Sequence, residues 1–261
     1  MSNKKYIITA VVLLAISLIA VSKAQPLKME KSFEVKSGGT FFLKSDAGSV
    51  EIESHDSDRV EIKVEKKGRS AEDFEVVFSK DGNDVRVVGK RENAWGWGNY
   101  SISVHFIVKV PKDYNVDLKT GGGSIHLSDL KGTVDANTSG GSITLGRIQG
   151  DVYVQTSGGA IRVEEVAGNI DAHTSGGSIN AKISKQPSDD CRLRTSGGSL
   201  TVYLAPQIAV DLEASTSGGR VNSEFDVDGL VKKQKIRGEI NGGGPKLELK
   251  TSGGSVRIKS L

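Results

Sequence analysis

The sequence contains a single cysteine, Cys191, and few aromatic residues. One cysteine cannot form an intrachain disulfide, and it cannot supply a zinc site that needs several cysteine ligands. The chain has only 7 Phe, 5 Tyr and 2 Trp beside 32 Gly, a balance that is unusual for a globular enzyme. Composition therefore excludes a disulfide-stapled domain and gives little support to an enzyme.

An excess of positive charge is also lacking once the N-terminal segment is set aside. Residues 1–24 combine Lys4 and Lys5, an apolar run and the small-residue ending Ser22-Lys23-Ala24, which is typical of a secretory signal. Their removal leaves 32 basic and 32 acidic residues. A neutral chain lacks the clustered charge that nucleic-acid binding needs. We therefore expect no nucleic-acid partner.

The apolar run of residues 6–21 is short for a membrane span. It has about 16 residues, against the roughly 20 that a spanning helix requires. We favour cleavage after Ala24 over retention as an uncleaved anchor. The mature chain is then expected to be exported, to the periplasm, the cell surface or the extracellular space. Residues 25–261 are long enough for one elongated domain with a large core.

The motif Thr-Ser-Gly-Gly recurs along the chain at a nearly fixed spacing. With the threonine as origin, successive copies are 18, 18, 18, 21, 21 and 35 residues apart, and they begin at Thr120 (as Thr-Gly-Gly-Gly), Thr138, Thr156, Thr174, Thr195, Thr216 and Thr251. A degenerate copy begins at Ser45. Self-similarity at a short period indicates a repeat architecture, in which each unit buries its apolar surface by stacking on its neighbours.

Apolar residues alternate with polar ones on both sides of each motif. The positions four and two before the threonine, and five and seven after it, are apolar in every copy except at Ser223. Cys191 occupies one of these columns, so we interpret it as a small core residue rather than a nucleophile. Alternation with period two indicates strands, and two recurrent glycine sites per repeat indicate two bends. The sequence therefore predicts an all-β, single-stranded β-solenoid with about 18 residues per coil.

The regular repeats extend over residues 116–261, and the degenerate copy at Ser45 precedes an interruption. Residues 54–100 predict a hairpin-bearing excursion, because short β-type runs at 74–78 and 85–88 are joined through Lys80-Asp81-Gly82-Asn83-Asp84. We expect this excursion to belong to the same solenoid domain and to fold against its first coils.

With these columns in place, the sequence resembles the bacterial putative-adhesin family of β-strand-repeat domains, a domain of unknown function. The matching features are the run Val108–Asp113 leading into Val116–Ile125, the serial Thr-Ser-Gly-Gly units, and Ile240–Gly244 before the last copy. The likeness covers roughly residues 30–261. It implies a right-handed β-helix in a secreted or envelope protein, and it brings no catalytic or binding residue.

Two polar patterns of the repeat carry candidate chemistry. Exposed threonine rows could order water as ice-binding solenoids do, but we favour a threonine that caps its bend and hydrogen-bonds its own ladder. Asp117, Asp135 and Asp171 share a column that suggests a metal site or an acid pair. Tyr153 interrupts that column, and no aspartate lies inside the glycine turn as calcium-binding repeats require, so we favour a solvated face.

The remaining candidates support neither a metal site nor a phosphate loop. The four histidines, His55, His105, His126 and His173, lie at different phases of the repeat, so they are interpreted as surface residues. The Gly-Gly pairs join strands, and no Lys-Ser or Lys-Thr opens a helix after them as in phosphate loops. We therefore expect no catalytic residue, no cofactor and no metal ligand.

Both tryptophans lie in one glycine-rich stretch, Trp95-Gly96-Trp97-Gly98-Asn99-Tyr100. Aromatic side chains in such a loop suit sugar stacking or a protein contact. The alternative is a loop that folds back and buries its rings. Trp95, Trp97 and Tyr100 are therefore candidate partner contacts.

The function predicted from these features is that of an exported, non-enzymatic β-solenoid of the cell envelope or surface, an adhesin or scaffold. Its partner would be a cell-surface glycan or a protein. The alternatives are a solenoid carbohydrate-active enzyme and an envelope-stress or peptide-sensing module. Because the chain ends only ten residues after Thr251, we also expect the C-terminal coil to be an open edge that promotes head-to-tail self-association.

Overall fold

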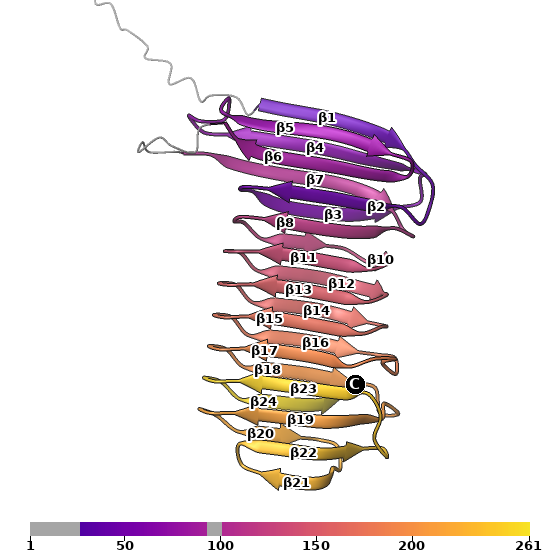
Figure 1. Cartoon of the computed structure of the whole chain (residues 1–261), viewed down its shortest axis with the longest axis vertical. Coiled ribbons are helices and arrows are strands. Elements are labelled where there is room, and N and C mark those ends of the chain that lie inside the picture. The colour runs from indigo at the N-terminus through magenta and orange to yellow at the C-terminus, as the bar shows by residue number, and fades with distance from the viewer. Residues whose placement is uncertain (1–26, 93–100) are drawn as a thin grey trace, which may run out of the picture.

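The computed structural model describes residues 27–92 and 101–261 (Figure 1). These residues form 24 strands and no helix. The strands stack in a rod of two facing sheets, each of 12 strands, with side chains of both sheets filling the space between them. The predicted all-β class is therefore confirmed.

Sheet A contains, in spatial order, β1 (Leu27–Glu34), β4 (Arg59–Lys67), β7 (Ser103–Pro111), β3 (Ser49–His55), β9 (Ile125–Leu127), β12 (Ile143–Gln149), β14 (Ile161–Val166), β16 (Ile179–Ile183), β18 (Leu200–Leu204), β24 (Val256–Ser260) and β20 (Val221–Ser223), with β10 (Leu130–Lys131) beside β12. Sheet B contains, from the same end, β5 (Phe74–Asp81), β6 (Asp84–Arg91), β2 (Thr40–Ser45), β8 (Asn115–Thr120), β11 (Val134–Thr138), β13 (Val152–Thr156), β15 (Ile170–Thr174), β17 (Cys191–Thr195), β23 (Lys246–Thr251), β19 (Val210–Thr216), β22 (Lys235–Ile240) and β21 (Asp228–Lys232).

The middle of the rod has the solenoid-like stacking that the repeat predicts. Each Thr-Ser-Gly-Gly motif joins a strand of sheet B to the next strand of sheet A, and neighbouring layers pair in parallel. Val134 pairs with Val152 and Thr138 with Thr156, so partners in these layers are 18 residues apart. The hand of the winding stays a prediction.

The apolar columns point inward, as their alternation predicts. All members of the four columns are buried except Ser223, which is half-buried. Cys191 is 1% exposed and lies in the core. Burying a Val, Leu or Ile side chain contributes roughly 1.5 to 3 kcal/mol, so several per layer hold neighbouring layers together.

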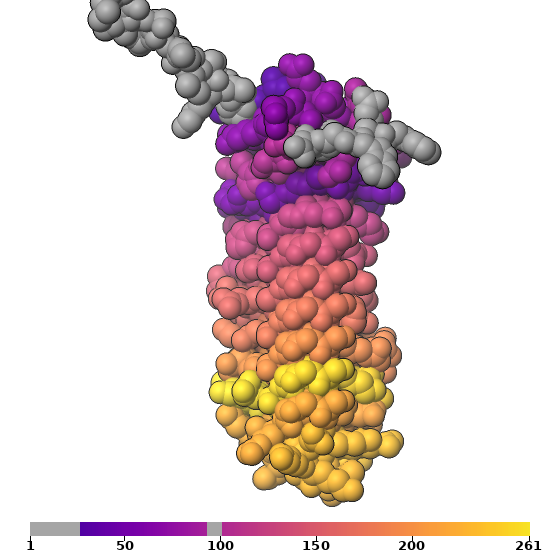
Figure 2. Space-filling model, turned by 90° about the vertical axis from the view of Figure 1, so that its left-hand side faces the viewer, coloured from indigo at the N-terminus to yellow at the C-terminus, as the bar shows by residue number. Residues whose placement is uncertain are grey.

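The threonine column is buried too, which makes the water-ordering interpretation wrong. Thr156 is 1% exposed, and its Oγ1 donates to the carbonyl of Gly141 in the preceding layer at 2.7 Å. The other threonines donate to equivalent glycine carbonyls. Each motif is thus bonded to its neighbour through a side chain, beside the backbone ladder, and the stacked turns form a column (Figure 2).

The second glycine of each motif is required by close stacking. A Cβ added to Gly141 would lie 2.2 Å from the carbonyl oxygen of Gly123, and one added to Gly159 would lie 2.2 Å from that of Gly141. The first glycine has room at Gly140, where a Cβ would meet its nearest neighbour at 3.9 Å, but at Gly158 and Gly176 that distance is 2.9 and 2.8 Å. The backbones at the turn therefore touch, which leaves no space for a side chain at the second site.

The last strand pair of the chain lies inside the stack. β23 pairs in parallel with β17 on one side and with β19 on the other, and β24 lies between β18 and β20. Figure 2 shows this yellow layer between two orange layers. The expectation that the C-terminal coil is an open edge is therefore wrong. The long gap before Thr251 holds β21 and β22, and it gives the chain the length to return between two earlier layers.

At the N-terminal end, too, the order of the strands in space differs from their order in the sequence. β2 lies between β6 and β8, and β3 lies between β7 and β9. Strands β6 and β7 therefore form a layer outside β2 and β3, although they come later in the sequence. The segment 54–100 supplies β4, β5 and β6 to this end, and the hairpin predicted around Gly82 is the antiparallel pair β5–β6.

Antiparallel strands extend both sheets at the N-terminal end of the parallel stack and sheet B at the other end, where sheet A ends in the parallel strand β20. At the N-terminal end β4 pairs with β7, β1 with β4, and β5 with β6. At the other end β22 pairs with β19, and β21 with β22. The strand at the far end of sheet B is β21, whose five residues are all exposed.

Candidate functional site

Several residues singled out by the sequence lie outside the described residues. These are the predicted signal segment 1–24 and the aromatic residues Trp95, Trp97 and Tyr100. Candidate sites are therefore drawn from residues 27–92 and 101–261, where no helix is long and apolar enough to cross a membrane. In the same ranges, no group of three His, Cys, Asp or Glu side chains is placed to hold a metal ion.

The aspartate column lies on the outer face of sheet B. Asp117 and Asp135 pair in register, while Tyr153 follows next and is 48% exposed. Burial raises the pKa of Asp135, and the charge of Asp117 raises it further. Asn137 Nδ2 donates to Asp135 Oδ1 at 2.6 Å, and Lys119 forms an ion pair with Asp117 at 3.2 Å. Neighbouring side chains thus satisfy these carboxylates.

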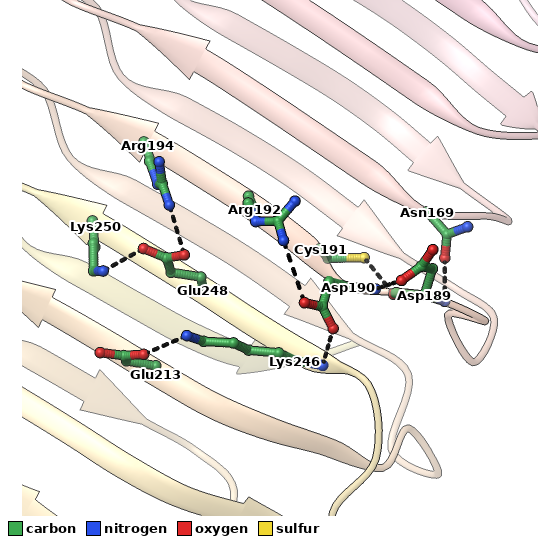
Figure 3. Close-up of polar contacts among 10 residues, drawn as sticks. All are labelled: Asn169, Asp189, Asp190, Cys191, Arg192, Arg194, Glu213, Lys246, Glu248 and Lys250. Carbon is green, nitrogen blue, oxygen red and sulfur yellow. Dashed lines mark hydrogen bonds and ion pairs between the residues drawn. The ribbon is translucent and has the colours of Figure 1, made fainter.

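A larger polar network on the same face surrounds the inserted strand β23 (Figure 3). Arg194 of β17 donates to Glu248 Oε2 at 2.7 Å, and Lys250 forms an ion pair with the other oxygen of Glu248. Lys246 Nζ lies 2.6 Å from Glu213 of β19. These contacts join β23 to both of its neighbours, so the network stabilises the insertion.

Glu248 is the buried member of this network. Only 5% of its side chain is exposed. Burial alone would raise the pKa of Glu248, but hydrogen bonds and charges from Arg194 and Lys250 outweigh it and lower the pKa to about 2. The carboxylate is therefore ionised and held by two cations, which makes its role structural.

The outer face of sheet A is hollowed by a groove of about 600 Å³, whereas two hollows on sheet B measure about 340 and 280 Å³. The groove is lined by His126, Leu127, Ser128, Asp129, Thr144, Leu145, Gly146, Arg162, Val163, Glu164, Asn180, Lys182 and Tyr203. Gly146 lies where the neighbouring strands carry outward side chains. A Cβ on Gly146 would lie 2.6 Å from Asp129 Oδ1, so the missing side chain deepens the groove.

Of the two acids that line this groove, Asp129 and Glu164, the first is bound by an arginine. Arg147 donates to Asp129 Oδ2 through Nε at 2.9 Å and through a terminal nitrogen at 2.6 Å. These hydrogen bonds and the charge of Arg147 lower the pKa of Asp129. The carboxylate of Asp129 is therefore ionised and held in place at the edge of the groove, and it is poorly suited to donate a proton.

Four other cations of the sheet A face, on β14, β16 and β24, have no such partners. Among the described residues, no hydrogen bond or ion pair joins Arg162, Lys182 or Arg257 to an acid, and Lys259 contacts only the ring of Tyr203, at 5.9 Å from its centre. On sheet B, by contrast, every cation of β17 and β23 has an acidic partner. Sheet A therefore presents free positive charge beside a groove.

A second hollow, of about 470 Å³, lies over β1, β4 and β7 at the N-terminal end. Two of its three cations are paired: Lys63 lies 3.0 Å from Glu65, and Lys109 lies 3.7 Å from Glu53. The third, Lys31, shares the hollow with the acids Glu30 and Glu61, which makes the groove beside Gly146 the stronger candidate.

Sequence analysis missed the groove residues, although a signal for them exists. Arg162, Asn180 and Arg257 occupy the column six residues after the motif threonine, while Lys182, Tyr203 and Lys259 occupy the column eight after it. Because side chains alternate along a strand, both columns are predicted to face outward. What the sequence lacks is the information that their charges stay unpaired and that Gly146 opens a hollow between them.

The chain matches a known family over part of its length. Residues 41–154 match the family model Toastrack DUF4097. The matched segment contains the inner layers of the N-terminal half and the first regular repeats, so the resemblance noted from the sequence is confirmed there. A Toastrack domain is a domain of unknown function, so the match assigns no activity.

Other comparisons add little. No curated protein matches the chain. Among solved structures, a putative cell adhesion protein from Clostridium sporogenes is similar at 16% identity and a TM-score of 0.40, covering 91% of this chain and 100% of that one. Putative adhesins from Bacteroides fragilis (13%, 0.39, covering 90% and 97%) and Parabacteroides merdae (12%, 0.37, covering 90% and 96%) are also similar. Likenesses this weak support no conclusion about the chain.

Proposed function

We propose that the protein is an exported, non-enzymatic rod of the cell envelope or surface that serves in adhesion or scaffolding through the outer face of sheet A. The observation that carries the proposal is a contrast between the outer faces of neighbouring layers, β17 and β23 on sheet B and β14, β16 and β24 on sheet A. Cations of sheet B around β23 are neutralised by acids of the same chain, whereas Arg162, Lys182 and Arg257 of sheet A are free to meet a partner.

The rod itself favours a binding role. Its outward side chains stand on strands whose ladder and buried columns hold them in register, so the face is a rigid, preorganised surface. A rigid surface loses little conformational entropy on binding, which suits adhesion or scaffolding. Export rests on residues 1–24 of the sequence, whose pattern is that of a cleaved secretory signal.

The state of the reactive groups favours a non-enzymatic role. Asp129 in the groove is held by Arg147, and Cys191 is buried in the core. Burial raises the pKa of the Cys191 thiol to about 11, so it remains a neutral thiol at ordinary pH. Neither group is available as a general acid or a nucleophile.

Cell fractionation and a surface-binding assay test the proposal together. Antibodies against the purified protein should locate it in envelope or external fractions, with Gln25 as its first residue by mass spectrometry. Beads coated with the protein should bind envelope material, and the double variant Arg162→Gln/Lys182→Gln should bind less.

The matched control is Arg192→Gln/Lys119→Gln, which removes the same charge from sheet B, where both side chains already have acidic partners. Equal loss in both variants would contradict the choice of face. Retention in the cytoplasm, or turnover of a panel of acidic polysaccharides, would overturn the proposed function.

A further inference from the structure

We infer that the partner of the sheet A face is a linear anionic glycan, one whose sugars carry carboxylate or sulfate groups. The inference rests on the proposed function and names the ligand class of the same surface. It is carried by the order of side chains along β14, β16, β18 and β24, where four cations stand among hydrogen-bonding groups and the acid Glu164.

Two parallel rows of side chains follow the axis of the rod. In the first row Arg162, Asn180, Thr201 and Arg257 are successive register partners. In the second row Lys182, Tyr203 and Lys259 are successive partners. With strands about 4.8 Å apart, the two arginines of the first row lie roughly 14 Å from each other. An extended ligand along the axis would meet a cation, two neutral polar groups and a cation again.

The free charges give this surface its preference for an anion. Paired surface charges contribute little to binding because each already has a partner. The acids on these strands are Glu164, which precedes Lys182 in the second row, and Glu165, whereas the cations are Arg162, Lys182, Arg257 and Lys259. The rows therefore keep an excess of unpaired positive charge, which attracts an anionic ligand over a neutral one.

The neutral side chains favour a sugar as the carrier of that charge. Asn180, Thr144 and Thr201 are half-buried amide and hydroxyl groups that can bond to sugar hydroxyls. Tyr203 is half-buried, borders the groove, and its ring is fixed by Lys259. An aromatic ring in that position suits the apolar face of a sugar ring. The hollow beside Gly146 leaves room for a branch or a substituent.

Other anionic partners fit less well. A lipid surface would be expected to meet several exposed apolar side chains, but of the exposed large hydrophobic residues of the described chain only Leu261, at the end of β24, adjoins these rows. The others are Leu27, Val77, Tyr153, Leu230 and Val231. A nucleic acid would call for several stacking aromatics, and this face offers Tyr203 alone among the described residues. The mixed polar and cationic rows therefore point to a glycan.

The test uses the mature protein and a galacturonic acid oligomer, with the methyl ester of the same oligomer as the uncharged control. We expect calorimetry at low salt to show binding of the acid form and weak or no binding of the ester. The variant Arg162→Gln/Lys182→Gln should bind about tenfold more weakly, since it removes two of the four unpaired cations. Tyr203→Ala should also weaken binding, whereas Arg192→Gln/Lys119→Gln should not.

Three results would overturn the inference. They are equal binding of the acid and ester forms, equal loss in the sheet A and sheet B variants, and preferential binding of phosphatidylglycerol vesicles or single-stranded DNA over the acid oligomer. Circular dichroism of each variant confirms that loss of binding does not come from unfolding. A protein that is exported and binds envelope material but ignores the acid oligomer would refute the ligand class and leave the proposed function standing.

Discussion

Arg194 of β17 and Glu248 of β23 meet at 2.7 Å although they are 54 residues apart in the sequence. Along the chain, β19 is the next strand of sheet B after β17, yet β23 lies between them. The contact therefore shows that the strands of sheet B are stacked in a different order from their order in the sequence. It places a nearly buried carboxylate between cations at the point where the order changes (Figure 3).

Engineered disulfides should report the inserted position of the last strand. Thr201 and Arg257 are register partners on adjacent strands, so cysteines at these two positions should oxidise to a disulfide, which requires Cα atoms about 4.4 to 6.8 Å apart. Thr201 and Asn222 have β24 between them, so the same cysteines there should not join. Non-reducing electrophoresis after mild oxidation distinguishes the two, and a bond in the second pair alone would refute the insertion.

The charge of Glu248 should stabilise the protein in a defined pH range. Glu248→Gln removes the charge that Arg194 and Lys250 bind, and we expect a loss of about 2 kcal/mol in the free energy of unfolding at neutral pH. Because the folded pKa is lowered to about 2 from 4.5, this contribution is complete above pH 4.5 and disappears as the pH falls towards 2.

Urea titrations of wild type and variant at several pH values test this expectation for Glu248. The exposed Glu164 serves as the control, because Glu164→Gln should cost little at any pH. A difference between wild type and Glu248→Gln that persists unchanged to pH 2 would contradict the role assigned to the charge.

The two glycines of a motif should respond differently to the same substitution. Gly141→Ala places a Cβ 2.2 Å from the carbonyl of Gly123, so layers must separate, and we expect a loss of about 2 to 4 kcal/mol. Gly140→Ala meets nothing closer than 3.9 Å and should change stability by under about 1 kcal/mol. Thermal unfolding of both variants, followed by circular dichroism, makes the comparison. Equal effects would show that the turn is not held by backbone contact.

The threonine hydroxyl should contribute to stability through its bond across layers. Thr156→Val keeps the shape of the side chain but leaves the buried carbonyl of Gly141 without its hydroxyl donor, which should cost about 1 to 3 kcal/mol. Thr156→Ser keeps the hydroxyl and should cost less. Thr144→Val, on the half-exposed outer face, is the control. Urea titration gives the three values, and a neutral Thr156→Val would refute the cross-layer role.

Much of the local structure could be read from the sequence. The apolar columns around Val134 and Ile143 predict strands with one buried face, because side chains on a strand alternate with period two. The Thr-Ser-Gly-Gly units predict bends, because only glycine fits where two backbones touch. The sequence also placed Cys191 in the core. These inferences depend only on residues within one repeat and on its recurrence, and both can be read from the sequence.

The order of the layers was decided only by tertiary structure. Every repeat offers the same ladder and the same apolar columns, so the local pattern does not say which layer pairs with which. The longer connection before Thr251 and side-chain contacts such as Arg194 with Glu248 select the observed neighbours. The groove has the same origin, because the contact of Gly146 with Asp129 and the unpaired state of Arg162 arise only when separate layers stack.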